Sequence, residues 1–154
     1  MERKLSLAYM AGFFDGEGYI GILKRKRKTW NIEYFIQISI GQIDGGVMDW
    51  VVENFGGHLH KVKRDGSYYW VISNKDAYLF LKQITPYLIY KKPQAELAIE
   101  FYENRKLQRP IPKEELARRE KIYLELKAMK KVFKTAYRIN VAPTTTKRTD
   151  SKEM

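Results

Sequence analysis

An N-terminal run of apolar and small residues that ends in two acids constrains the fold of this chain more than any other segment. At helical spacing Ala8, Gly12 and Gly16 share one face, with Ala11 and Asp15 beside them, and the larger apolar side chains point elsewhere. Small side chains let a second helix approach closely. The pattern therefore predicts a helix that pairs with a copy of itself through its glycine face and buries its large side chains in its own subunit.

The end of this helix is acidic. Gly18 ends the helix and Tyr19 opens an extended run, so Glu17 is expected at a helix-to-strand junction. If two such helices pair, the two Glu17 carboxylates lie beside their symmetry axis.

Residues 10–18, Met-Ala-Gly-Phe-Phe-Asp-Gly-Glu-Gly, resemble the nine-residue signature of the LAGLIDADG homing endonucleases. Met10 replaces the leucine, and the Ala-Gly pair and the acidic ending are retained. In that family, chains with one copy of the signature act as homodimers and chains with two copies act as pseudo-symmetric monomers. Since this chain has one copy, the resemblance implies a homodimer.

Composition favours a nucleic acid partner. The chain has 29 Lys and Arg against 18 Asp and Glu, a formal net charge of +11. No run approaches a membrane span and no signal peptide precedes the motif, so no membrane partner is expected. No small-molecule cofactor is expected either. The absence of cysteine excludes disulfides and Cys-based zinc sites and is compatible with an intracellular compartment, either a prokaryotic cytoplasm or an organelle (chloroplast or mitochondrion).

The periodicity predicts a single domain over residues 1–141 and a disordered basic tail over 142–154. After the first helix we expect strands at 19–23 and 32–40, a helix at 47–54, strands at 58–63 and 68–73, and helices at 75–88, 93–106 and 113–137. This order indicates an α+β fold, a four-stranded antiparallel sheet with helices on one face. The resemblance implies the same α-β-β-α-β-β-α order, a saddle-shaped sheet whose bare face lies in the DNA major groove, and extra helices after it.

The chemistry expected at the motif is metal-assisted phosphodiester hydrolysis. Mg²⁺ prefers hard oxygen ligands, so Glu17 is the predicted metal ligand, assisted by the Gly16 carbonyl, and Mn²⁺ is expected to substitute. Asp15 is expected to accept hydrogen bonds from the backbone of the partner helix rather than to bind metal. The predicted dimer interface comprises Ala8, Ala11, Gly12, Asp15 and Gly16.

Two further active-site residues are implied by the resemblance. The family uses a polar residue after the second strand to position water, and Gln42 fits that place. It also uses a lysine near the scissile phosphate, and Lys91 fits, with Lys92 as the alternative. An amide can orient water, and an ammonium group can stabilise charge on a phosphoryl group.

DNA contacts are predicted on the bare face of the sheet and at the tip of its first hairpin. The phosphate-binding residues expected at the tip are Lys24, Arg25, Lys26, Arg27 and Lys28. The outward positions expected to read bases are Tyr19, Leu23, Arg25, Glu33, Gln37, Ser39, His60, Arg64, Tyr68 and Trp70. The register of the second hairpin stays open, because Lys61 and Lys63 compete with His58 and His60 for the outer face. The two histidines lack a third ligand nearby, which disfavours a metal site.

These features predict a homodimeric, Mg²⁺-dependent endonuclease that cuts double-stranded DNA at a long, partly palindromic site and, by resemblance, is encoded within an intron. The alternatives are an RNA maturase that assists splicing without cleavage and a DNA-binding regulator with an inactive site. Glu17, together with Lys91 and Gln42, favours the nuclease, because non-cutting relatives need none of the three.

Overall fold

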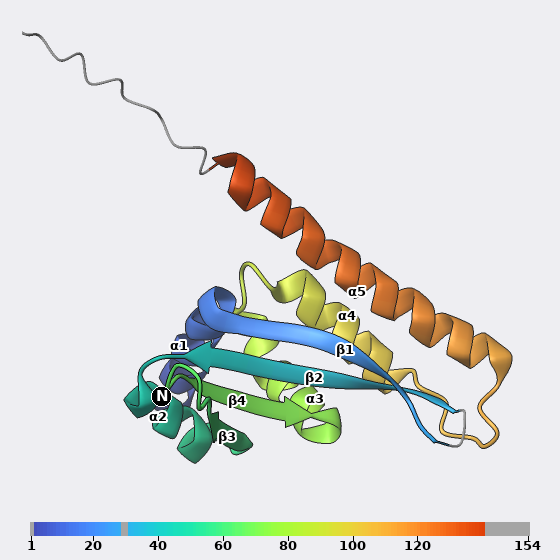
Figure 1. Cartoon of the computed structure of the whole chain (residues 1–154), viewed down its shortest axis with the longest axis horizontal. Coiled ribbons are helices and arrows are strands. Elements are labelled where there is room, and N and C mark those ends of the chain that lie inside the picture. The colour runs from blue at the N-terminus through green and yellow to red at the C-terminus, as the bar shows by residue number, and fades with distance from the viewer. Residues whose placement is uncertain (1, 29–30, 141–154) are drawn as a thin grey trace, which may run out of the picture.

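The computed structural model describes residues 2–28 and 31–140, with side chains described as far as residue 130. The elements are α1 Glu2–Glu17, β1 Gly18–Lys26, β2 Ile32–Gln42, α2 Gly45–Phe55, β3 His58–Lys61, β4 Tyr68–Ser73, α3 Asn74–Ile84, the 3-10 turn η1 Thr85–Tyr87, α4 Lys92–Glu103 and α5 Lys113–Asn140. The strands form one antiparallel sheet in the order β1-β2-β4-β3. Helices α3 and α4 lie behind this sheet, and α5 runs along its β1 edge (Figure 1). The predicted α+β fold with additional C-terminal helices is confirmed, and the predicted tail at 142–154 lies outside the described residues.

The central strand β2 shows why the sheet has one covered face. Tyr34, Ile36, Ile38 and Ile40 alternate along it and are all buried in the core, where Phe14 of α1 joins them. Burying each large aliphatic side chain stabilises the fold by roughly 1.5–3 kcal/mol. The helices therefore cover this face, and the intervening residues of β2 lie on the bare face.

The register of the second hairpin corrects one prediction. His60 pairs with Tyr69 and Leu59 pairs with Trp70, so the histidine faces outward and the tryptophan faces the helices. Trp70 is fully buried, and its indole Nε1 donates to the carbonyl of Gly56 at 2.7 Å. The prediction that Tyr68 and Trp70 face outward is wrong, because strand alternation places both on the side of Leu59.

Two further predicted positions differ in the structure. Ser39 lies on the bare face by register, but its side chain is only 4% exposed, because its direct neighbours Tyr19 and Val71 are larger. Lys24 was expected in a loop, but β1 continues to Lys26, and Lys24 points toward the helix face. There its Nζ is 2.9 Å from a carboxylate oxygen of Glu120 in α5.

Some helix and strand bounds also differ from the sequence estimates. The predicted helix at 75–88 stops at Ile84 and continues only as the short 3-10 turn, since Pro86 cannot extend an α-helix. The strand predicted at 58–63 ends at Lys61, α4 ends at Glu103, and α5 reaches Asn140. No helix in the described part of the chain combines the length and the apolar character needed to cross a bilayer.

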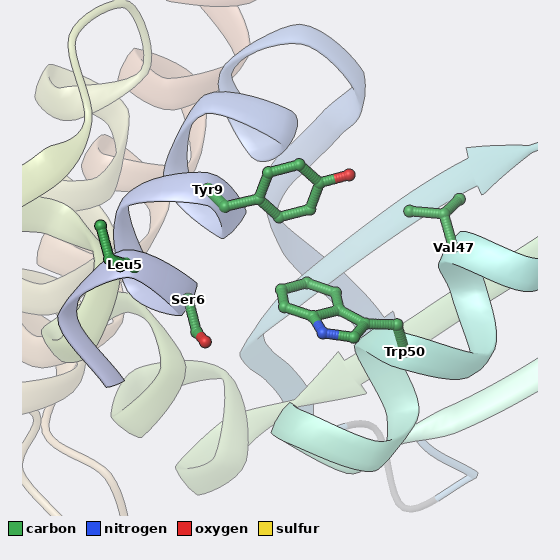
Figure 2. A pocket seen from close by; sticks show the side chains of 5 residues that line it. All are labelled: Leu5, Ser6, Tyr9, Val47 and Trp50. Atoms are coloured by element: carbon green, nitrogen blue, oxygen red, sulfur yellow. The ribbon is translucent and has the colours of Figure 1, made fainter. Parts of the chain in front are cut away.

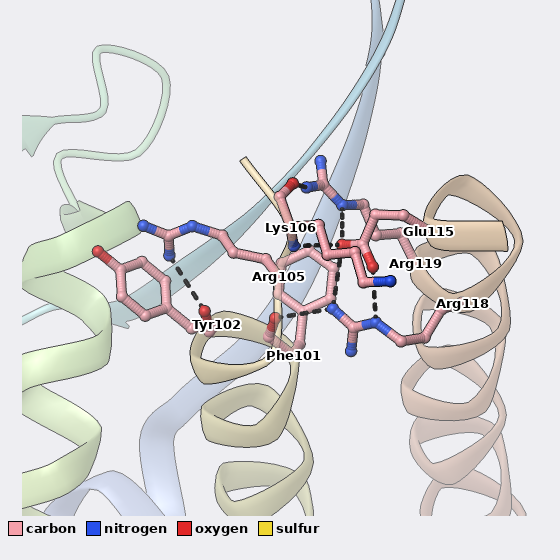
Figure 3. A network of polar contacts seen from close by, with 7 residues as sticks. All are labelled: Phe101, Tyr102, Arg105, Lys106, Glu115, Arg118 and Arg119. Carbon is pink, nitrogen blue, oxygen red and sulfur yellow. Dashed lines mark hydrogen bonds and ion pairs between the residues drawn. The ribbon is translucent and has the colours of Figure 1, made fainter. Parts of the chain in front are cut away.

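A buried carboxylate fixes α5 to the end of α4 (Figure 3). Glu115 accepts from Arg119 Nε at 2.7 Å, from Arg118 Nε at 3.0 Å and from the backbone N–H of Lys106 at 3.1 Å. Burial alone would raise the pKa of Glu115, but these donors outweigh it and lower the pKa to about 2. Arg119 also donates to the Lys106 carbonyl, so the start of α5 is held by several charge-assisted hydrogen bonds.

Candidate active site

The exposed stripe of α1 contains both glycines of the motif. Gly12 and Gly16 are exposed, and a Cβ atom built at either would meet nothing within 4 Å. Leu5 and Tyr9 lie along the same side of the helix and are 67% and 56% exposed, large values for apolar side chains. The sequence reading missed both residues, although their spacing of seven and three from Gly12 could have identified them.

The predicted interface residue Ala11 does not belong to this stripe. It is fully buried in its own subunit's core, because one helical position turns it about 100° away from Gly12. Its assignment to a dimer interface is therefore wrong. Ala8, by contrast, is exposed beside Gly12.

A cavity of about 470 Å³ adjoins the stripe, between α1 and α2. Leu5, Ser6 and Tyr9 of α1 line one side, and Val47 and Trp50 of α2 line the other (Figure 2). The Tyr9 and Trp50 rings meet edge to face, with their centroids 5.1 Å apart. The surface beside the glycines is therefore apolar, hollowed and open, a surface that a second chain can cover.

The junction of α1 and β1 presents Glu17 to the outside. A side chain at Gly18 would come within 2.3 Å of the buried Phe14 ring, so only glycine fits at the first position of β1. Glu17 precedes it as the last residue of α1 and is exposed, as is Gly16. Neighbouring hard oxygen donors are thus available on one exposed corner.

Asp15 binds its own subunit rather than a partner helix. Its carboxylate accepts from the backbone N–H groups of Ile89 at 2.8 Å, Tyr90 at 3.2 Å and Lys91 at 2.8 Å, which lie directly before α4. Orphan N–H groups at a helix start favour an anion at this place. The predicted role of Asp15 in the dimer interface is therefore wrong. Its carboxylate instead caps the N-terminal end of α4 by accepting from the N–H groups just before that helix.

Lys91 reaches the same corner from the other side. Its Nζ donates to the carbonyl oxygen of Asp15 at the end of α1. Burial lowers the pKa of Lys91, and the negative charges of Asp15 and Glu17 partly oppose this shift. Lys92 is exposed and is the first residue of α4. The geometry thus brings Lys91 to Asp15 and near Glu17.

We expect Asp15→Ala to lower the free energy of unfolding by about 1–2 kcal/mol, the usual cost of losing a helix cap. Equilibrium urea denaturation measures this change. Asp49→Ala is the matched control, because Asp49 is an exposed acid on α2, and its removal should leave the urea midpoint unchanged. Equal midpoints for the two variants would contradict the capping role.

Gln42 lies at the end of β2, at the same end of the sheet as Glu17. Gly18 pairs with Ile40, so the chain two residues beyond Ile40 runs beside the end of α1. The Gln42 Oε1 accepts from the backbone N–H of Ile43 at 2.9 Å, and no hydrogen bond of its amide nitrogen is seen to the part of the chain that the structure describes.

The bare face carries most of the other predicted DNA-binding side chains. Tyr19, Leu23, Arg25, Glu33, Gln37 and His60 lie on it by register, and Tyr69 and Val71 replace Tyr68 and Trp70 there. Glu33 accepts from Arg25 at 2.9 Å and from Arg27 at 3.0 Å, and these guanidinium groups hold the pKa of Glu33 below its ordinary value. Arg64 lies in the second hairpin turn and is strongly exposed. Lys26 and Lys28 are exposed at the end of the first hairpin.

One chain supplies only some of the oxygen ligands that a hard divalent cation needs. Among the described residues there is no group of three acidic or histidine side chains placed to hold a metal ion. The Glu17 carboxylate and the Gly16 carbonyl are oxygen donors of the kind Mg²⁺ prefers, and both residues are exposed at the end of the open stripe. Because Mg²⁺ has octahedral coordination and usually keeps several waters, these donors could supply only part of its coordination shell.

Comparisons with known proteins identify the family and the fold. The family model for the LAGLIDADG endonuclease matches residues 10–107. The fold is similar to that of the homing endonuclease I-CvuI, solved with a DNA target in the presence of Mg, with a TM-score of 0.74 at 19% identity over 82% of this chain and 83% of that one. The archaeal intron-encoded homing endonuclease I-Vdi141I, complexed with DNA, gives 0.69 at 20% identity over 81% and 84%. The meganuclease I-SmaMI gives 0.68 at 17% identity over 76% of this chain but 42% of that one. Comparison with curated protein sequences gives no significant match.

Proposed function

The chain belongs to the LAGLIDADG endonuclease family, and we propose that two copies of it form a metal-dependent, site-specific endonuclease for double-stranded DNA. The observation that carries this proposal is the open stripe of α1 ending at Glu17, with Lys91 held beside it by Asp15. The relatives that share the fold include proteins solved with DNA. The formal net charge of +11 on this chain favours such a polyanionic partner.

We propose that pairing of the stripes brings the two Glu17 carboxylates to the dyad of a homodimer. Each carboxylate, with the Gly16 carbonyl, would hold a divalent cation, Mg²⁺ or in its place Mn²⁺, against one DNA strand. When bound, such a cation lowers the pKa of water and neutralises charge on the phosphate.

The remaining chemistry belongs to the side chains around Glu17. The Lys91 ammonium group, which donates to the Asp15 carbonyl beside Glu17, is proposed to stabilise charge that develops on the phosphoryl oxygens. The Gln42 amide is proposed to orient the attacking water. The long bare face of β1 and β2 suits a long target, which a two-fold symmetric dimer would read as a partly palindromic site.

The test is incubation of the purified protein with a duplex that joins the sequences flanking its reading frame, since an intron-encoded enzyme would target its own insertion site. Cleavage of both strands to short staggered ends is expected with Mg²⁺ or Mn²⁺. Tight binding that leaves the duplex intact with either metal would contradict the proposal and favour a maturase or a regulator. The proposed activity places the protein with DNA in a prokaryotic cytoplasm or an organelle.

A further inference from the structure

Helix α5 and the edge strand β1 enclose a groove of about 400 Å³. The family model matches residues 10–107, so it covers β1 but not α5, which forms the other wall of the groove. The groove is lined by Tyr19 and Lys24 of β1 and by Tyr123, Leu126, Lys127 and Lys130 of α5. Figure 1 shows α5 lying along β1 for most of the length of the strand. Since Tyr19 faces the bare side of the sheet and Lys24 faces the helices, the groove wraps around the sheet edge.

The side of α5 that faces β1 is basic and aromatic. The Nζ of Lys130 lies 3.8 Å from the centroid of the Tyr19 ring, and that of Lys127 lies 5.6 Å from the centroid of Tyr123. Glu125 is the one acid between Tyr123 and Lys130, and it projects about 160° around the helix from Tyr123. Glu120 lies on the same side of α5, closer to its N-terminus. Its carboxylate forms an ion pair with Lys24 and accepts a hydrogen bond from the Tyr34 hydroxyl.

The position of Tyr19 connects this groove to the bare face. A side chain at Gly21 would come within 2.6 Å of the Tyr19 ring, so the ring lies across the bare face of β1 toward α5. Its side chain is 43% exposed, with Lys130 above the ring. A duplex on the bare face therefore has a continuous path to the lysines of α5.

Covering the sheet edge explains why α5 packs against β1, but not why this side of α5 carries lysines. An edge strand exposes unpaired backbone groups, and a packed helix protects them. The buried residues Ile122 and Leu126 anchor the helix, and Glu115 fixes its start. This packing requires no lysines on the side toward β1, where Lys127 lies beside the half-buried Tyr123 ring and Lys130 beside the exposed Tyr19 ring.

We propose that α5 is a second DNA-binding element, in which Lys127 and Lys130 contact backbone phosphates of the duplex beside the footprint of the sheet. The inference rests on the proposed function, because it assumes that the bare face holds duplex DNA. Lysine contacts to phosphates add affinity without sequence choice, and they release counterions. Helix α5 would thus add phosphate contacts to those expected at the first hairpin.

The experiment measures binding of a fluorescent 40-base-pair duplex of arbitrary sequence, without divalent metal, as a function of salt. The variant is Lys127→Gln/Lys130→Gln. The control is Lys75→Gln/Lys121→Gln, which removes the same charge at two exposed positions. Lys75 lies on α3, and Lys121 lies on α5 but points about 160° away from Tyr123 around the helix. Four lost phosphate contacts per dimer should reduce the slope of log K against log salt by about 3 to 4, whereas the control should stay close to wild type.

The outcomes separate the inference from the proposed function. Equal slopes for the variant and the control, with wild-type protein that binds the duplex, overturn the inference alone. Wild-type protein that does not bind the duplex at any salt overturns the proposed function. Loss of binding to a structured RNA but not to the duplex also overturns the role of α5 in DNA binding. If the double variant does not fold by circular dichroism, Lys127→Gln alone should reduce the slope by about 2, and an unchanged slope overturns the inference.

Discussion

Glu17→Gln is expected to abolish DNA cleavage, by at least about 10³-fold, while leaving binding of the target within about twofold of wild type. The substitution keeps the size of the side chain and removes the charge that would hold a divalent cation. Glu17 is exposed at the end of α1, so its loss should not disturb the core. Single-turnover cleavage and equilibrium binding of the same duplex measure the two effects separately.

Glu53→Gln is the matched control for this substitution. Glu53 is also an exposed helical glutamate, but it lies on α2 and outside the corner formed by Asp15, Glu17 and Lys91. The control should cut at the wild-type rate. Cleavage by Glu17→Gln at a rate close to that of the control would show that Glu17 is not the metal-binding carboxylate.

Gly12→Leu is expected to raise the dissociation constant of the dimer by about 100-fold or more, as much as losing an interface hot spot, because the leucine would hold the two helices apart. Cleavage should be lost with the dimer. In one chain a Cβ at position 12 would meet nothing within 4 Å, and the position is exposed, so the subunit itself has room for a larger residue. Leucine also favours a helix over glycine by roughly 0.5–1 kcal/mol. The monomer should therefore fold at least as well as before, and only close helix pairing should suffer.

Analytical ultracentrifugation over a range of concentrations measures the predicted dissociation. Ala128→Leu provides the control, because it adds a large side chain at an exposed position of α5, away from α1. A Gly12→Leu protein that sediments as a dimer with the wild-type dissociation constant would exclude pairing through this stripe.

The order of elements and the position of Glu17 could be predicted because both depend on local patterns. The alternation in β2 identifies the covered face, and the glycine that ends α1 fixes the junction. The second hairpin is different. Residues 68–72 are all apolar or aromatic, so their pattern does not show which side chains of β4 face the helices. Only Leu59, the one apolar residue between His58 and His60, indicates which face of this hairpin is covered.

The partner of Asp15 could not be predicted for another reason. Its hydrogen bonds reach backbone groups 74 to 76 residues away, and no sequence pattern encodes which N–H groups the fold brings to an acid. The buried position of Ala11 was predictable in principle, since a 100° step per residue separates it from Gly12. Ala11 therefore lies outside the glycine face.

A mixed dimer tests the account most directly. One wild-type subunit and one Glu17→Gln subunit, copurified through two affinity tags, would be incubated with a supercoiled plasmid that carries the insertion site. If each Glu17 serves one strand at the dyad, the plasmid should accumulate as the open circle with a single nick. Linear plasmid formed at the wild-type rate, or a plasmid left fully supercoiled, would contradict the pairing of two α1 helices around one duplex.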